Sequence, residues 1–355
     1  MSEVDVREAG AADADGLAGL LRAAPQAGRM VVAQDRTPDV FARRRPFDRA
    51  VTLLVDPPSD GRDADDLPAA AVTVTTKKVR AAGTWMTAGY VFDLAVAPTA
   101  RRRGLGALLL DAAEQWARGE EAALLYAHVV AENEPSRGVF ERAGYRGAAR
   151  IVTRIVPAHR TRPTPPPGRL AIGDWDRAAT ILDAAQHDRD LAIPLDGDTL
   201  SRRWRDLPGW REDDVWSTGR SVLGLWDRRP IVRYLPASLP PEVRALTAAA
   251  RVAATLRMPF PDPPRPGEPI STGYLLGGAG DDAELSSLFR AALGRARERG
   301  LQHVVVFHDE RTRPRWVRAA IQVPETYLLM VRPLVAEAPA HEVGHRPIAV
   351  DPLDM

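Results

Sequence analysis

A glycine turn preceded by three arginines is the part of the sequence whose residue types point most directly to chemistry. Arg101-Arg102-Arg103-Gly104-Leu105-Gly106-Ala107 follows a strand-like run and opens a segment with apolar residues at helical spacing. Glycines let backbone amides approach a ligand, and the first turn of a helix offers unpaired N–H groups to an anion. The pattern predicts a bound phosphate or pyrophosphate. A glycine-rich turn with solvated arginines is the alternative.

A second group of residues with chemical potential lies further along the chain. His128 stands near the end of the strand-like run 123–130, and Asn133 and Phe140-x-x-x-Gly144-Tyr145 follow it. An imidazole with a pKa near ~6.5 accepts a proton well at neutral pH, so His128 is a candidate base. The alternative is a histidine that only fills the face of a strand. Three other polar residues rank below it as auxiliaries: Tyr90, Glu132 and Asp93, the last of which strand alternation places opposite Leu94 and Val96.

The elements that must position these groups follow a strand and helix order. In the first part we expect strands at 4–7, 50–55, 70–79, 91–98, 123–130 and 144–156, and helices at 12–24, 39–44, 105–118 and from Pro135. A proline-rich stretch at 157–168 cannot continue a sheet or helix and predicts a linker. The expected division is therefore a domain at 1–157, a linker at 158–168, a second domain at 169–337 and a flexible tail at 338–355.

The second part repeats this order, which indicates an internal duplication. The turn at the matching position reads Gly277-Gly-Ala-Gly-Asp-Asp282. Acidic residues at a helix start are good caps, but they repel a pyrophosphate, so this half is expected to be a degenerate partner domain without a CoA of its own. Its six tryptophans are read as core rather than as a ligand cleft.

The motif His341-Glu342-Val343-Gly344-His345 matches the zinc-protease pattern H-E-x-x-H, whose histidines must share one face of a helix. It lies between Pro339 and Pro347 in the expected tail. We therefore set catalytic zinc aside and assign no metal site.

Composition limits the classes of function. The 355 residues include no cysteine, which excludes disulfides, thiolate nucleophiles and cysteine-ligated zinc. A formal net charge of +1 argues against a nucleic-acid partner. No basic leader and no apolar run long enough to cross a membrane is found, so a cytoplasmic protein without a membrane partner is expected. A homodimer is left open.

The run Leu94-Ala95-Val96-Ala97-Pro98, the Arg101-x-x-Gly104-x-Gly106 turn, Asn133 and Phe140-x-x-x-Gly144-Tyr145 together resemble the GNAT superfamily of acyl-CoA-dependent N-acyltransferases. The resemblance implies an α/β fold with two tandem GNAT-like domains, each a splayed mixed β-sheet flanked by helices, the second degenerate. It implies a V-shaped opening between Leu94–Val96 and Ala127–Val129 that holds the pantetheine arm of acetyl-CoA. The implied cofactor-binding residues are Leu94, Val96, Arg101, Arg102, Arg103, Gly104, Leu105, Gly106, Ala107, Asn133, Ser136 and Phe140.

The expected activity is transfer of an acetyl group from CoA to a primary amine of a small molecule, peptide or protein, with His128 and Asn133 as catalytic residues. His128 would take the amine proton, and backbone amides near Leu94 and Val96 would hold the oxyanion. Phe140 departs from the family, whose tyrosine at this position protonates the leaving thiolate, because phenylalanine has no hydroxyl. Two alternatives stay open: a non-catalytic acyl-CoA-binding or regulatory protein, and a transferase that uses a longer acyl or carrier-protein donor.

Overall fold

The computed structural model describes residues 5–25, 31–57, 67–158, 174–238, 248, 268–318, 323–336 and 339–355. Its strands are β1 (Val6–Glu8), β2 (Val31–Asp35), β3 (Arg49–Val55), β4 (Ala70–Ala81), β5 (Thr84–Val96), β6 (Leu124–Val130), β7 (Arg146–Pro157), β8 (Val215–Ser217), β9 (Val222–Asp227), β10 (Arg233–Ser238), β11 (Thr272–Ala279), β12 (His303–Asp309) and β13 (Val323–Pro333). The α-helices are α1 (Ala14–Ala23), α2 (Leu105–Gly119), α3 (Glu134–Arg142), α4 (Trp175–Gln186), α5 (Gly197–Arg205) and α7 (Asp282–Glu298).

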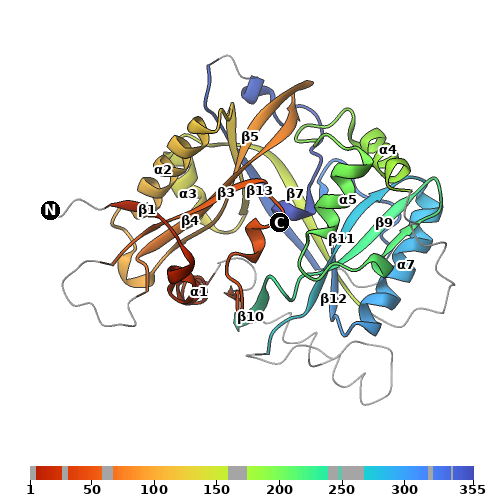
Figure 1. Ribbon diagram of the computed structural model, residues 1–355, viewed down its shortest axis with the longest axis horizontal. Coiled ribbons are helices and arrows are strands. Elements are labelled where there is room, and N and C mark those ends of the chain that lie inside the picture. The colour runs from red at the N-terminus through yellow and green to blue at the C-terminus, as the bar shows by residue number, and fades with distance from the viewer. Residues whose placement is uncertain are drawn as a thin grey trace.

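One mixed sheet runs through both halves of the chain (Figure 1). Within the described residues its eleven strands lie in the order β1-β3-β4-β5-β6-β13-β7-β12-β11-β9-β8. The first half contributes β4, β5 and β6, of which β5 and β6 are parallel. The second half repeats this with β9, β11 and β12, of which β11 and β12 are parallel. The repeated order agrees with the internal duplication that the sequence pattern indicates.

The two halves exchange their last strands. β13 pairs antiparallel with β6 from Tyr327–Val130 to Pro333–Leu124, so a strand of the second half extends the sheet of the first. β7 pairs antiparallel with β12 from His303–Pro157 to Asp309–Ile151, so a strand of the first half extends the sheet of the second. β7 and β13 also pair with each other and join the two halves. A division at 157–158 therefore separates the chain but not the sheet. The predicted linker lies almost wholly outside the described residues.

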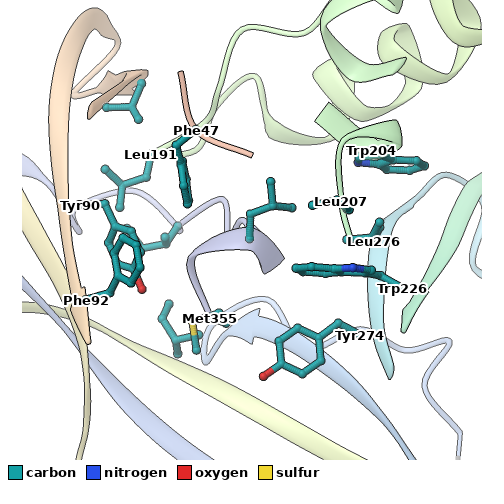
Figure 2. Close-up of a cluster of buried hydrophobic side chains, with 14 of the residues drawn as sticks. Phe47, Tyr90, Phe92, Leu191, Trp204, Leu207, Trp226, Tyr274, Leu276 and Met355 are labelled. Carbon is teal, nitrogen blue, oxygen red and sulfur yellow. The ribbon is translucent and has the colours of Figure 1, made fainter. Parts of the chain in front are cut away.

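Helices cover the sheet and enclose three apolar cores. α1, α2 and α3 pack on the first half, where Leu109, Leu125 and Ala127 are buried together. α7 encloses Leu288 and Val304 in the second half. A third cluster fills the space between the halves, and Figure 2 shows its aromatic side chains on both sides of Met355. The tryptophans at 175, 204, 216, 226 and 316 are buried in these cores, as the sequence favoured.

Two sequence expectations about local structure are wrong. The segment 39–44 forms only a 3₁₀ turn at Ala42–Arg44, because the Asp39 carboxylate accepts the N–H of Phe41 at 3.0 Å and Pro46 prevents continuation. The flexible tail expected at 338–355 is instead packed into the molecule beyond Ile348, which is 1% exposed. The end of this segment lies between the two halves (Figure 1).

Candidate active site

The opening in the sheet arises where two parallel strands stop pairing. β5 and β6 pair only from Ala88–Leu124 to Tyr90–Tyr126, although β5 continues to Val96 and β6 to Val130. The register between β4 and β5 also shifts at this level, which makes a β-bulge at Asp93, where φ is +52°. The two arms beyond Tyr90 and Tyr126 therefore separate, at the level where the family resemblance implies a V-shaped opening.

Backbone alternation directs two amides of β5 into this opening. The N–H of Ala97 donates to the carbonyl of Ala69, next to β4, at 2.9 Å. Successive N–H groups of a strand point to opposite edges, so those of Val96 and Leu94 point away from β4. They face the arm that carries His128 and are available to a ligand.

The turn after β5 presents a helix start without a side-chain cap. Gly104 occupies the N-cap of α2 with φ +82°, and no side chain accepts a hydrogen bond there. A Cβ on Gly104 would meet no atom within 4 Å, so the space in front of the turn is open. Arg101, Arg102 and Arg103 are all exposed beside it. Unpaired N–H groups, the helix dipole and three guanidinium groups therefore act together on any anion at this place.

Gly106 serves a different purpose from Gly104. It is buried, and a Cβ there would lie 3.1 Å from Cγ1 of Val139 on α3. The absence of a side chain lets α2 and α3 pack closely. Leu105 is also buried, whereas Ala107 is exposed on the first turn.

The corresponding helix of the second half is already capped. Asp281 accepts hydrogen bonds from the N–H groups of Ala283 at 2.9 Å and Glu284 at 3.1 Å. A Cβ on Gly280 would lie 2.3 Å from the carbonyl of Arg220, so the glycine makes room for the protein's own backbone. The acidic turn stabilises α7 and leaves no cationic face for a phosphate.

His128 lies on the opposite arm, on the face that points between the halves. Its ring centroid is 5.9 Å from that of Tyr90 and 6.0 Å from that of Tyr126. Both ring nitrogens are buried and have no hydrogen-bond partner among the described residues. Burial lowers the pKa of His128 to about 3, and the nearby Lys77 and Arg43 cations act in the same direction. The imidazole is therefore neutral at physiological pH.

The remaining predicted residues have mainly structural contacts. Asn133 caps α3, and its side-chain oxygen accepts the N–H of Ser136 at 3.2 Å. Phe140 is 3% exposed and packs edge-to-face on Tyr145, with ring centroids 5.0 Å apart. These contacts lie on α3 and on the α2 side of the sheet.

Sequence reasoning missed the polar group that the last segment builds below the opening. Lys77 on β4 donates to the carboxylates of Asp351 at 3.0 Å and Asp354 at 2.6 Å. Asp354 also accepts the Tyr126 hydroxyl at 2.8 Å, and Arg203 contacts Asp351 at 2.6 Å. Burial alone would raise the pKa of Asp351, but the Lys77 and Arg203 cations outweigh it and hold this pKa well below its usual range. The only local signal was Asp351-Pro-Leu-Asp354, in which Asp351 accepts the N–H of Leu353 as a turn cap.

A second polar group surrounds Asp93. The face of β5 that carries Asp93 is opposite that of Leu94 and Val96, as alternation predicted, and the carboxylate accepts from Arg36 at 2.8 Å and Arg43 at 2.6 Å. Arg43 also donates to the Tyr90 hydroxyl at 3.1 Å. The rings of Tyr90 and Phe92 lie against each other (Figure 2), and their centroids are 5.1 Å apart.

The H-E-x-x-H motif has no helical support. Its first residues belong to a 3₁₀ turn, Pro339–Glu342, and Gly344 then adopts φ +95° against the carbonyl of Ala148. The two histidines therefore do not share one face of an α-helix, which zinc chemistry of this type requires.

Comparison with known families agrees with the geometry. Residues 72–145, which span the opening, the turn and α3, match the model of the acetyltransferase (GNAT) family. The similarity to this family is therefore carried by the first half of the chain. A search of curated proteins by sequence found no match.

Two solved structures share the architecture over nearly the whole chain. A GCN5-related N-acetyltransferase from Sphaerobacter thermophilus is 17% identical, with 99% of each chain covered and a TM-score of 0.55. N-myristoyltransferase from Saccharomyces cerevisiae with bound myristoyl-CoA is 8% identical, with 99% of this chain and 90% of that chain covered and a TM-score of 0.64. At these identities the similarity shows the fold. None of the described helices has the length and apolarity needed to cross a membrane.

Proposed function

We propose that this protein is an N-acetyltransferase that moves an acetyl group from acetyl-CoA to a primary amine by direct attack in a ternary complex. The observation that carries the proposal is the open, uncapped N-terminus of α2 beside three exposed arginines. That site binds the pyrophosphate, and the free amides of Leu94 and Val96 align the pantetheine arm and then the oxyanion. The thioester carbon therefore lies at the level where β5 and β6 separate.

A short acyl group suits the space below this point. The rings of Tyr90 and Tyr126, the last paired residues of β5 and β6, have centroids 5.1 Å apart, and both residues are 2% exposed or less. On the other face, a Cβ at Gly89 would lie 2.4 Å from Cδ2 of Leu125, so that side is also filled. A longer acyl chain would have to displace these close-packed side chains, which is unfavourable.

His128 is proposed as the residue that contacts the acceptor amine. Its ring nitrogens have no partner among the described residues, so one of them can accept a hydrogen bond from the attacking amine. Because its pKa is about 3, His128 stays in the accepting form and orients the amine, but it holds a proton only briefly. The proton then passes to solvent. The leaving thiol, with a pKa near ~8.5, departs without the usual tyrosine.

The test is thiol release from acetyl-CoA with a panel of primary amines, combined with calorimetric binding of acetyl-CoA. Gly104→Asp should lose at least tenfold in affinity, because a carboxylate then competes at the helix start. Gly104→Asn is the matched control, since it has the same shape and a similar tolerance of positive φ but no charge. Equal affinity of the two variants would contradict the site. Replacement of Gly106 is unsuitable because its side chain would separate α2 from α3.

The second candidate is a protein that binds acyl-CoA without transfer, which the absence of a hydroxyl at Phe140 favours. It is supported if wild type binds acetyl-CoA but releases no thiol with any amine. A donor with a longer acyl chain is supported if octanoyl-CoA reacts faster than acetyl-CoA.

For the proposed acetyltransferase, the variant His128→Ala should reduce turnover while leaving acetyl-CoA affinity unchanged.

A further inference from the structure

Three arginines gather around Asp93, of which Arg36 and Arg228 are buried and Arg43 is half-buried. Arg36 follows β2, Arg43 lies in the 3₁₀ turn after it, and Arg228 follows β9 in the second half. Arg36 and Arg228 are each 1% exposed. Arg36 and Arg43 share the single carboxylate of Asp93, and Arg228 donates to the main-chain oxygen of Met355 and lies 4.2 Å above the Tyr274 ring.

This arginine cluster, Arg36, Arg43 and Arg228, has more positive charge than its neighbours balance. Among the side-chain carboxylates of the described residues, Asp93 alone contacts its guanidinium groups, and the other acceptors include Gln34 Oε1 and the main-chain oxygens of Asp354 and Met355. The neighbouring network is balanced, with Lys77 and Arg203 against Asp351 and Asp354. A buried charge without a counter-charge is costly, so the unequal ratio calls for a further anion.

Unsatisfied donors point to the same conclusion. Arg36 Nη1, Arg43 Nε and Arg228 Nε are buried and have no acceptor among the described residues. The pKa of the neighbouring Tyr234 reflects the positive potential of the cluster; the hydroxyl of this residue lies 3.1 Å from that of Tyr274. Burial would raise the pKa of Tyr234, but Arg228, the Tyr274 hydrogen bond and the other two guanidinium groups outweigh it and lower the pKa.

The cluster lies next to the site of transfer. Asp93 is the bulge residue at the start of the β5 arm, and Arg43 contacts the hydroxyl of Tyr90, the last residue of β5 that pairs with β6. The ring of Tyr90 is in turn the neighbour of His128. The phosphate turn is at the far end of the same arm, so an anion at the cluster would belong to the acceptor and not to CoA.

We propose that the acceptor is an amine that carries an anionic group, such as the carboxylate of a small amino acid, and that Arg36, Arg43 and Arg228 bind this group. The proposal rests on the proposed acyltransferase function and names its substrate class. Charge-assisted hydrogen bonds to the carboxylate satisfy the open donors and balance the charge, and they direct the amine toward His128. The same potential disfavours acceptors with several positive charges.

Wild-type enzyme alone supplies the first test. Thiol release is measured with β-alanine, with its neutral isostere β-alaninamide and with the diamine 1,3-diaminopropane, each corrected for its free-base fraction. We expect kcat/KM for β-alanine to exceed that for β-alaninamide by about tenfold or more, with the diamine lowest. Equal or higher kcat/KM for β-alaninamide or the diamine overturns the proposal and leaves the acyltransferase function intact. A parallel arm with ethanolamine phosphate distinguishes a carboxylate from a phosphate as the preferred anion.

Conservative variants locate the effect. Arg36→Lys and Arg228→Lys keep a positive charge but lose the planar donor set, so the preference for β-alanine should fall at least threefold. Arg233→Lys is the control, because its partner is Asp35 at 2.6 Å and its side chain is 42% exposed. Melting curves confirm that each variant is folded, and a retained preference in both folded cluster variants overturns the assignment.

If no amine is acetylated, the anion site is tested by calorimetric measurement of β-alanine binding in the presence of CoA. Binding of β-alanine that is lost in Arg228→Lys supports the site without transfer, and the proposed function alone fails. Absence of β-alanine binding to wild type overturns the anion site.

Discussion

Nζ of Lys77 lies 2.6 Å from the carboxylate of Asp354, although the two residues are 277 positions apart in sequence. Lys77→Met leaves two buried carboxylates with Arg203 as their remaining cation. We expect a loss of about 3–5 kcal/mol in the free energy of unfolding, which denaturant titration measures. Lys78→Met, at the exposed neighbouring position, is the control and should change stability by less than about 0.5 kcal/mol. Similar curves for the two variants would show that the pair contributes no stability.

The depressed pKa of His128 gives a pH dependence with a definite sign. Above pH ~6.5 the residue is neutral in both states, and between ~6.5 and 3 only the unfolded state binds the proton, so stability is lost as pH falls. His303, whose pKa burial lowers to about 4, acts in the same direction. The free energy of unfolding, measured by thermal unfolding between pH 7 and 5, should depend on pH less steeply in His128→Gln than in wild type. The difference in slope should correspond to about one bound proton. The exposed His187→Gln should retain the wild-type slope.

The same pKa also predicts the kinetic profile. If His128 contacts the amine in its neutral form, kcat/KM, corrected for the free amine, should show no His128 inflection near pH 6.5. A titration at that pH that disappears in His128→Gln, while His187→Gln keeps it, would mean that the imidazole has an ordinary pKa in the working enzyme.

Phe140→Tyr tests whether the missing hydroxyl limits the reaction. The ring is buried against Tyr145, whose own hydroxyl has no partner among the described residues. A further buried hydroxyl should therefore cost about 1–3 kcal/mol of stability and leave kcat within about twofold. Denaturant titration and initial rates with acetyl-CoA measure both effects. A tenfold rise in kcat would instead place the new hydroxyl at the leaving thiol.

The strand exchange predicts that the first half does not fold alone. Residues 1–157 lack β13 and leave β6 with an unpaired edge that favours aggregation. We expect soluble protein only when residues 158–355 are co-expressed, and a one-to-one complex on size-exclusion chromatography. A fusion of residues 323–333 to the first fragment should recover part of the solubility. A soluble, monomeric 1–157 fragment with native acetyl-CoA affinity would show that the halves are independent.

Local signals allowed the phosphate turn to be predicted from sequence. Gly104 and the arginines lie within a few residues of one another, and their meaning depends on the strand before them and the helix after them. Asp281 could be interpreted as a cap in the same way, because a carboxylate at an N-cap acts on its own helix. The separation of β5 from β6 was accessible only through the family resemblance.

The rest depended on contacts between distant residues. Nothing around Val323–Pro333 indicates that it pairs with β6 and not with its sequence neighbour β12. Lys77 reads as an exposed strand residue until Asp351 and Asp354 are placed beside it. Arg36 and Arg228 are ordinary surface residues by type, and only the fold buries both beside Asp93. Pro339 and Pro347 suggested a tail, yet Ile348 and Leu353 beyond them are buried.

During synthesis, β13 leaves the ribosome long after β6, the strand with which it pairs. The first pair of β6 with β13 joins Val130 to Tyr327, so nearly two hundred residues are synthesised between the partners. At ~5–20 residues per second this takes roughly 10–40 s, during which the edge of β6 has emerged without its neighbour. β7 is available much earlier and can occupy that edge in a non-native pairing. Its departure when β13 arrives would then be a slow step in maturation of the nascent chain.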